Sequence, residues 1–96
     1  MLTHIVLYKL KSSTTASQRE NLLRQARTRL PAVPGVRNLT AGVSIYKDDP
    51  YQCALVMYFE DEAALDRYRV HPDHLRFVEE IVKPLAEEIK RLDYLG

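Results

Sequence analysis

The chain has 96 residues, of which 46% are hydrophobic and 28% are charged, which is typical of one globular domain near the lower size limit for a single core. Its formal net charge is +1, from 14 basic and 13 acidic side chains, so charge does not predict nucleic acid or a membrane surface as a partner. The single cysteine, Cys53, cannot form an intrachain disulfide, and the first residues lack the long apolar run of a signal peptide. We therefore expect a single cytoplasmic domain over residues 1–96, with no transmembrane segment.

The first half of the chain predicts a strand, a helix and a second strand. Leu2–Leu10 is short and rich in Ile, Val, Leu and Tyr, which indicates a strand. A helix is expected next, because a capping box can begin at Thr15 or at Ser17, and apolar residues then recur at helical spacing until Pro31. Residues 36–45 alternate apolar with polar or small side chains, which predicts the second strand.

The second half predicts a strand, a broken helix and a closing strand. Tyr51–Phe59 is the third strand, and the acidic residues that follow it favour a helix start near Asp61. Pro72 would clash inside that helix but fits the first position of a new one. The apolar stripe of the new helix, headed by His74, comprises Phe77, Val78, Ile81, Leu85 and Ile89. Residues 92–95 are then expected to form a short closing strand.

The predicted order β-α-β-β-α-β is the ferredoxin-like arrangement, an α+β fold in which both helices cover one face of an antiparallel sheet. In residues 2–10 and 51–59, however, the side chains on both faces of the strand are mainly apolar. Two helices can cover only one face, and a bare apolar face would be an aggregation hazard. We therefore expect a homodimer in which the second faces of two sheets pack together into a shared barrel.

The segment HPDH, residues 71–74, places two histidines on either side of a Pro-Asp pair. A metal site would need at least three ligands, but only His4 and Cys53 remain as partners, and the usual zinc signatures of paired cysteines or HExxH are absent. We interpret His71 instead as the cap of a helix whose positive end meets Asp73. We accordingly expect no metal and no cofactor.

His74 differs from His71, because an imidazole at the head of an apolar stripe faces the sheet and its ring nitrogens need partners. Tyr68 ends close by on the preceding helical segment. On the sheet, His4 and Tyr8 share one face of the first strand, and Cys53 lies on the neighbouring strand. These side chains predict a ligand pocket between sheet and helices, whose apolar lining comprises Val6, Leu55, Phe77 and Val78.

The chain resembles the stress-responsive α/β-barrel (Dabb) family in four segments: HIVLYKLK, FEDEAALDRYRVHPDH, VKPLAEE and LDYLG. Members of that family are homodimers with a β-barrel between the subunits. Their known functions range from heat-stable plant stress proteins without established catalysis to a polyketide cyclase that makes olivetolic acid and a hydroxynitrile lyase. In the cyclase, the tyrosine and the second histidine of the Y-x-x-H-P-x-H motif act in catalysis. The resemblance therefore implies catalytic roles for Tyr68 and His74.

Three functions remain open on these residues. A histidine with a pKa near ~6.5 can take a proton from a carbon between two carbonyls while a tyrosine hydroxyl stabilises the enolate, as in a cofactor-independent cyclase or lyase. The same pocket can bind a small carbonyl or polyketide-like ligand without turnover. Alternatively, Tyr68 and His74 form a core hydrogen bond in a non-catalytic stress or structural protein. A large pocket lined by Tyr68, His74 and His4 would favour the first two functions, and a filled core the third.

Overall fold

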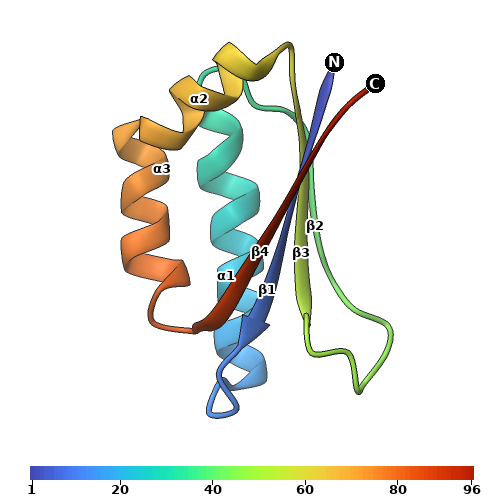
Figure 1. The fold of residues 1–96 in the computed structure, drawn as a ribbon. Coiled ribbons are helices and arrows are strands. Elements are labelled where there is room, and N and C mark those ends of the chain that lie inside the picture. Colours follow the sequence, from blue (N-terminus) through green and yellow to red (C-terminus); the bar gives the residue numbers. More distant parts are fainter.

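A computed structural model describes residues 1–96 and contains one sheet covered by helices (Figure 1). The first elements along the chain are β1 (Leu2–Leu10), α1 (Ala16–Arg29), the 3-10 turn η1 (Leu30–Ala32), β2 (Arg37–Val43) and β3 (Cys53–Phe59). They are followed by α2 (Glu62–Val70), α3 (Pro72–Phe77), the π-helical turn η2 (Val78–Val82) and β4 (Ala86–Leu95). None of the helices combines the length and the apolar character needed to cross a bilayer.

The four strands form one antiparallel sheet in the order β2-β3-β1-β4, with β1 and β3 at its centre. All three α-helices lie on the same face of this sheet, and the two ends of the chain meet at the same end of it (Figure 1). The N-terminal amine accordingly donates a hydrogen bond to the Gly96 carbonyl oxygen at 3.3 Å. This topology confirms the α+β, ferredoxin-like fold predicted from the order of the elements.

Side-chain caps fix where the helices begin. Thr15 and Gln18 form a complete capping box at α1, which is the first of the two predicted possibilities. The Asp61 carboxylate caps α2 by accepting a hydrogen bond from the backbone N–H of Ala64. His71 caps α3, as expected, because its Nδ1 accepts a hydrogen bond of 3.1 Å from the backbone N–H of Asp73.

The predicted helix from His74 to Ile89 is wrong beyond Val82. The helical segment ends there, and β4 begins at Ala86, so Ile89 lies on a strand. Pro84 explains the difference, because it lacks a backbone N–H and its ring would clash with the preceding turn of a continuing helix. The closing strand is therefore ten residues long and not the short segment 92–95.

The two faces of the sheet are both apolar, but only one is covered. Alternate residues of β1 and β3 are buried against the helices, and the residues between them are half-buried on the outer face. The pairing registers place on this outer face the apolar side chains of Ile5, Leu7, Ala54, Val56, Tyr58, Leu92 and Tyr94. No helix of the chain covers them (Figure 1).

Candidate functional site

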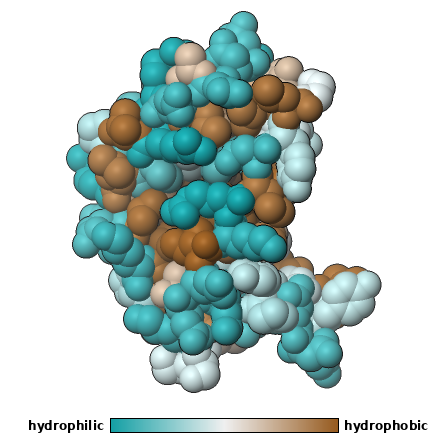
Figure 2. Space-filling model, in the orientation of Figure 1, coloured by the Kyte–Doolittle hydropathy of each residue, from teal (hydrophilic) through white to brown (hydrophobic).

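A cavity of about 450 Å³ lies between the inner face of β1 and β4 and the helical segments α2, α3 and η2. The strands contribute His4, Val6, Tyr8, Ile89 and Arg91 to its lining. The helical segments contribute Tyr68, Arg69, His74, Leu75, Val78, Val82 and Lys83. In the space-filling view, brown apolar surface is enclosed by teal polar surface where α3 faces β4 (Figure 2). Small-molecule sites commonly have volumes of about 300 to 1,000 Å³ and this kind of mixed lining.

Tyr68 and His74 form a pair of tilted rings in close contact at this cavity. Their centroids are 4.2 Å apart and the ring planes are inclined by 41°. The chain brings them together because α2 ends at Val70 and α3 begins at Pro72, so the two rings flank the bend at His71. The His74 Nδ1–H donates a hydrogen bond of 3.1 Å to the carbonyl oxygen of Arg69, whereas the Tyr68 hydroxyl has no hydrogen-bond partner within the protein. Nε2 of His74 is therefore the nitrogen with the free lone pair.

The surroundings of the pair keep both rings neutral. Burial lowers the pKa of His74, the hydrogen bond to the Arg69 carbonyl opposes this, and the nearby positive charges of Arg91 and Arg69 act in the same direction as burial. Burial likewise raises the pKa of the Tyr68 and Tyr8 hydroxyls well above the usual range. At neutral pH the cavity thus contains an imidazole that can accept a proton and phenols that can donate hydrogen bonds.

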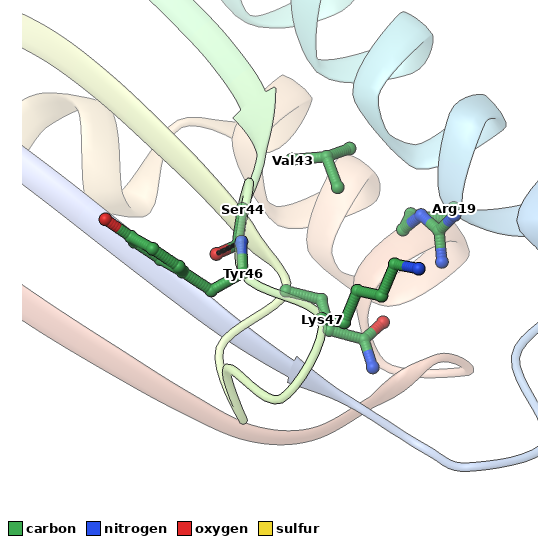
Figure 3. Close-up of a pocket in the computed structure, with 6 residues that line it drawn as sticks. Arg19, Val43, Ser44, Tyr46 and Lys47 are labelled. Carbon is green, nitrogen blue, oxygen red and sulfur yellow. Dashed lines mark hydrogen bonds between the residues drawn. The ribbon is translucent and has the colours of Figure 1, made fainter.

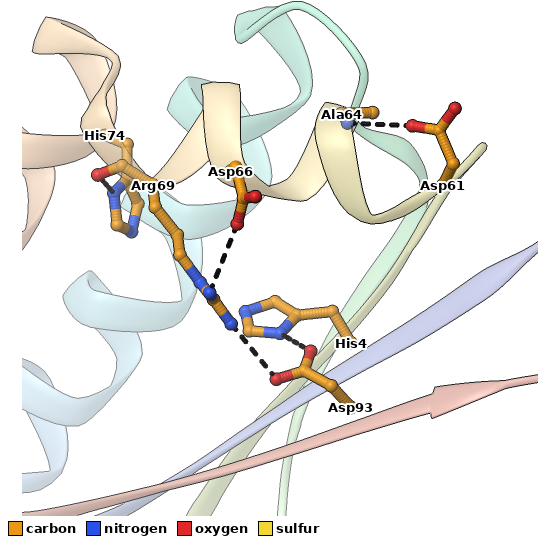
Figure 4. A network of polar contacts seen from close by, with 7 residues as sticks. All are labelled: His4, Asp61, Ala64, Asp66, Arg69, His74 and Asp93. Carbon is orange, nitrogen blue, oxygen red and sulfur yellow. Dashed lines mark hydrogen bonds and ion pairs between the residues drawn. The ribbon is translucent and has the colours of Figure 1, made fainter.

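His4 belongs to a polar network that joins β1, β4 and α2, in which Asp93 links His4 to Arg69 (Figure 4). It is 3% exposed and lies directly opposite Asp93 on the adjacent strand. Its Nδ1–H donates a hydrogen bond of 2.5 Å to the Asp93 carboxylate, and Arg69 approaches the other carboxylate oxygen at 3.3 Å. The carboxylate fixes the orientation of the imidazole and leaves Nε2 without a partner within the protein. The His4 ring also packs edge-on near Tyr68, with centroids 6.2 Å apart.

Asp93 and Arg69 were not among the predicted site residues. For Asp93 the sequence carries a usable signal, because it is the single charge in the apolar segment 92–95. Antiparallel pairing of that segment with the first strand, as the ferredoxin-like order requires, would have placed it near His4. Arg69 carries no such signal, since Arg67 on the same helix is similar in sequence and does not reach the cavity.

Six of the predicted site residues line the cavity, namely His4, Val6, Tyr8, Tyr68, His74 and Val78. The other three, Cys53, Leu55 and Phe77, are each 1% exposed in the core and do not line it. Cys53 and Leu55 are displaced because their strand, β3, is separated from β4 by β1. Cys53 therefore lies opposite Tyr8, not beside His4, and burial raises the pKa of its thiol, so the thiol stays protonated. Phe77 faces the end of α1, where the Arg29 guanidinium is 5.8 Å from its ring centre.

A second hollow, of about 250 Å³, lies between the first turn of α1 and the loop after β2. Its lining comprises Arg19, Val43, Ser44, Tyr46, Lys47 and Gln52. Lys47 extends toward Arg19, and Tyr46 extends away from both (Figure 3). It contains neither a histidine nor a carboxylate, so it offers no acid–base pair. The first cavity is the candidate site.

No group of three or more His, Cys, Asp or Glu side chains comes together in a way that could hold a metal ion. The two histidines of the HPDH segment have separate positions, since His71 caps a helix and His74 lines the cavity.

Comparison with known families gives a match over residues 2–95 to the Stress responsive A/B Barrel Domain (Dabb). The chain belongs to the Dabb family. A comparison with curated proteins found no match.

Solved structures agree with this Dabb assignment. A Dabb family protein with a ferredoxin-like fold from Mesorhizobium loti is 30% identical, with a TM-score of 0.86 over 99% of this chain and 95% of that one. A dimeric ferredoxin-like protein of unknown function from Thermobifida fusca is 24% identical, with a TM-score of 0.85 over 99% and 90% of the two chains. A hydroxynitrile lyase from Passiflora edulis is 21% identical, with a TM-score of 0.84 over 99% and 92%. The last two likenesses show the fold alone.

Proposed function

We propose that this Dabb protein binds a small carbonyl compound in the cavity between β1, β4, α2 and α3. The observation that carries the proposal is that Tyr68 and His74 both line the cavity, while the Tyr68 hydroxyl and the His74 Nε2 have no hydrogen-bond partner within the protein. A structural role would instead join the two groups by a hydrogen bond, since buried polar groups are usually paired. Free polar groups at an apolar cavity are typical of ligand sites.

The lining matches the two parts of such a ligand. The phenol hydroxyls of Tyr68 and Tyr8 are donors for a carbonyl oxygen, which accepts hydrogen bonds and cannot donate them. Val6, Val78 and Ile89 offer apolar contact for the hydrocarbon part of the molecule.

Catalysis of proton transfer is the second candidate, favoured by the fixed tautomer of His74. The proton on a carbon next to the carbonyl would move to Nε2, and the electron pair of the C–H bond would move into the enolate, whose oxygen accepts a hydrogen bond from Tyr68. This chemistry needs no cofactor and would suit a cyclase-like or lyase-like reaction.

We also propose that a second copy of the chain covers the outer face of the sheet. The support is the uncovered apolar surface that includes Ile5, Leu7 and Val56, together with solved relatives from Thermobifida fusca and Bacteroides fragilis that are described as dimeric. Light scattering at micromolar concentration should give the mass of a dimer, and a monomer mass would contradict the proposal.

Titration calorimetry with benzoylacetone, a neutral diketone, tests the ligand proposal. We expect wild-type protein to bind it, and Tyr68→Phe to bind it more weakly by about 0.5 to 1.5 kcal/mol through loss of one hydrogen bond. Tyr46→Phe is the matched control, because that ring is exposed and lies outside the cavity. Equal weakening in both variants, or no binding by the wild type, would contradict the proposal.

Deuterium exchange at the carbon between the two carbonyls, followed by NMR, separates catalysis from binding alone. Proton transfer predicts exchange faster than in buffer, lost in His74→Gln while benzoylacetone still binds. Exchange at the buffer rate with bound ligand would limit the function to binding.

A further inference from the structure

Arg91 is the one cation at the cavity whose charge is not neutralised. It lies on the inner face of β4 and forms no ion pair within the protein, whereas the other two cations of the lining are paired. Arg69 contacts Asp93 at 3.3 Å, and Lys83 contacts Glu79 at 2.8 Å. The cavity lining contains no carboxylate, and the nearby Asp93 is already shared between His4 and Arg69.

The position of Arg91 suits contact with a ligand. It lines the cavity and is exposed on the edge strand β4, so it can meet a molecule that enters. Its charge acts on the pKa of both Tyr8 and His74, which places the guanidinium near the rings that would hold a carbonyl group. An edge-strand cation that only prevented aggregation would have no need to line the cavity.

We propose that the ligand carries a carboxylate bound by Arg91, while Tyr68 holds its carbonyl group, so that the ligand class is a small oxo acid. This rests on the proposed function, since it names the class of carbonyl compound for the same cavity. A guanidinium is always charged and matches a carboxylate with two parallel N–H donors. The apolar wall between the two polar ends then contacts the hydrocarbon part of the acid.

The test compares two probes that differ in charge, 4-oxo-4-phenylbutanoate and its primary amide. Calorimetry should show that the wild type binds the acid about tenfold more tightly than the amide, as one charged hydrogen-bond pair implies. In Arg91→Gln the ratio should fall to about one. Arg67→Gln is the matched control, because it removes the same charge from an exposed position outside the cavity, and it should keep the wild-type ratio.

The outcomes separate the two proposals when benzoylacetone is titrated in the same series. If it binds but the wild type does not prefer the acid, or the preference survives in Arg91→Gln, the role of Arg91 is overturned and carbonyl binding stands. If none of the three probes binds, both proposals are overturned. The wild-type comparison of acid and amide decides even if Arg91→Gln does not fold.

Discussion

The two halves of the helix-covered sheet face are built differently. On the half that includes β3, the side chains of Cys53, Leu55, Leu22 and Ala26 are at most 1% exposed and pack as a continuous core. On the half that includes β4, polar rings border a cavity of about 450 Å³. One half therefore supplies close packing, and the other keeps polar groups that packing alone does not require.

The break between α2 and α3 produces this difference. α1 is one continuous helix of 14 residues, whereas the chain on the other half turns at His71 and Pro72 (Figure 1). The turn sets Tyr68 and His74 on the two sides of a bend above β1 and β4. A single straight helix would place residues six apart on different faces, so the break itself brings these rings together.

Truncation of a side chain in each half should give the largest contrast. Leu55→Ala leaves a hole in close packing and should lower the free energy of unfolding by about 2 to 5 kcal/mol. Val6→Ala removes a wall of the existing cavity, so its cost should be clearly smaller. Urea unfolding of the two variants measures both values, and equal losses would mean that the two halves are packed alike.

Removal of the Asp93 carboxylate should have the next largest effect. Asp93→Ala leaves the buried Nδ1–H of His4 without an acceptor, which should cost about 1 to 3 kcal/mol. Asp93→Asn retains an oxygen that can accept this hydrogen bond and should cost less. If both variants unfold at the same urea concentration as the wild type, the pairing of His4 with Asp93 does not stabilise the fold.

The pH dependence of stability gives a smaller contrast. Because the pKa of His74 is lower in the folded protein than in the unfolded chain, the unfolded chain binds the extra proton first as the pH falls. The contribution of His74 to stability should therefore decline from about pH 6.5, the usual histidine pKa, downward. Urea unfolding between pH 7 and pH 5 should show a shallower decline for His74→Gln than for the wild type, and parallel curves would contradict this origin.

The fold could be predicted from the sequence because its signals are local. The strand-forming residues of β1, the alternation in β2, the acidic helix start near Asp61 and the caps at Thr15 and His71 each depend on a few neighbouring residues. The error at Ile89 has the same origin, because its local spacing fits a helix although Pro84 interrupts the segment.

The candidate site was predictable only in part, because it depends on contacts between distant segments. His4 and Asp93 are 89 residues apart and meet only through the register of β1 with β4. Cys53 and Leu55 have the apolar character of a pocket wall, and only the strand order places them away from the cavity. The unpaired charge of Arg91 becomes visible once the partners of Arg69 and Lys83 are known.

The most direct test of whether this ring pair serves a ligand and not the fold is a measurement of unfolding free energies. It compares three variants, Tyr68→Phe, His74→Gln and the double variant. The Tyr68 hydroxyl has no hydrogen-bond partner within the protein, so its removal should change stability by less than about 0.5 kcal/mol, with His74→Gln losing at most about 1 kcal/mol. The double variant should then equal the sum of the two. Losses of about 1 to 3 kcal/mol in each single variant, with the double variant no worse than either, would reveal a structural hydrogen bond and contradict the account.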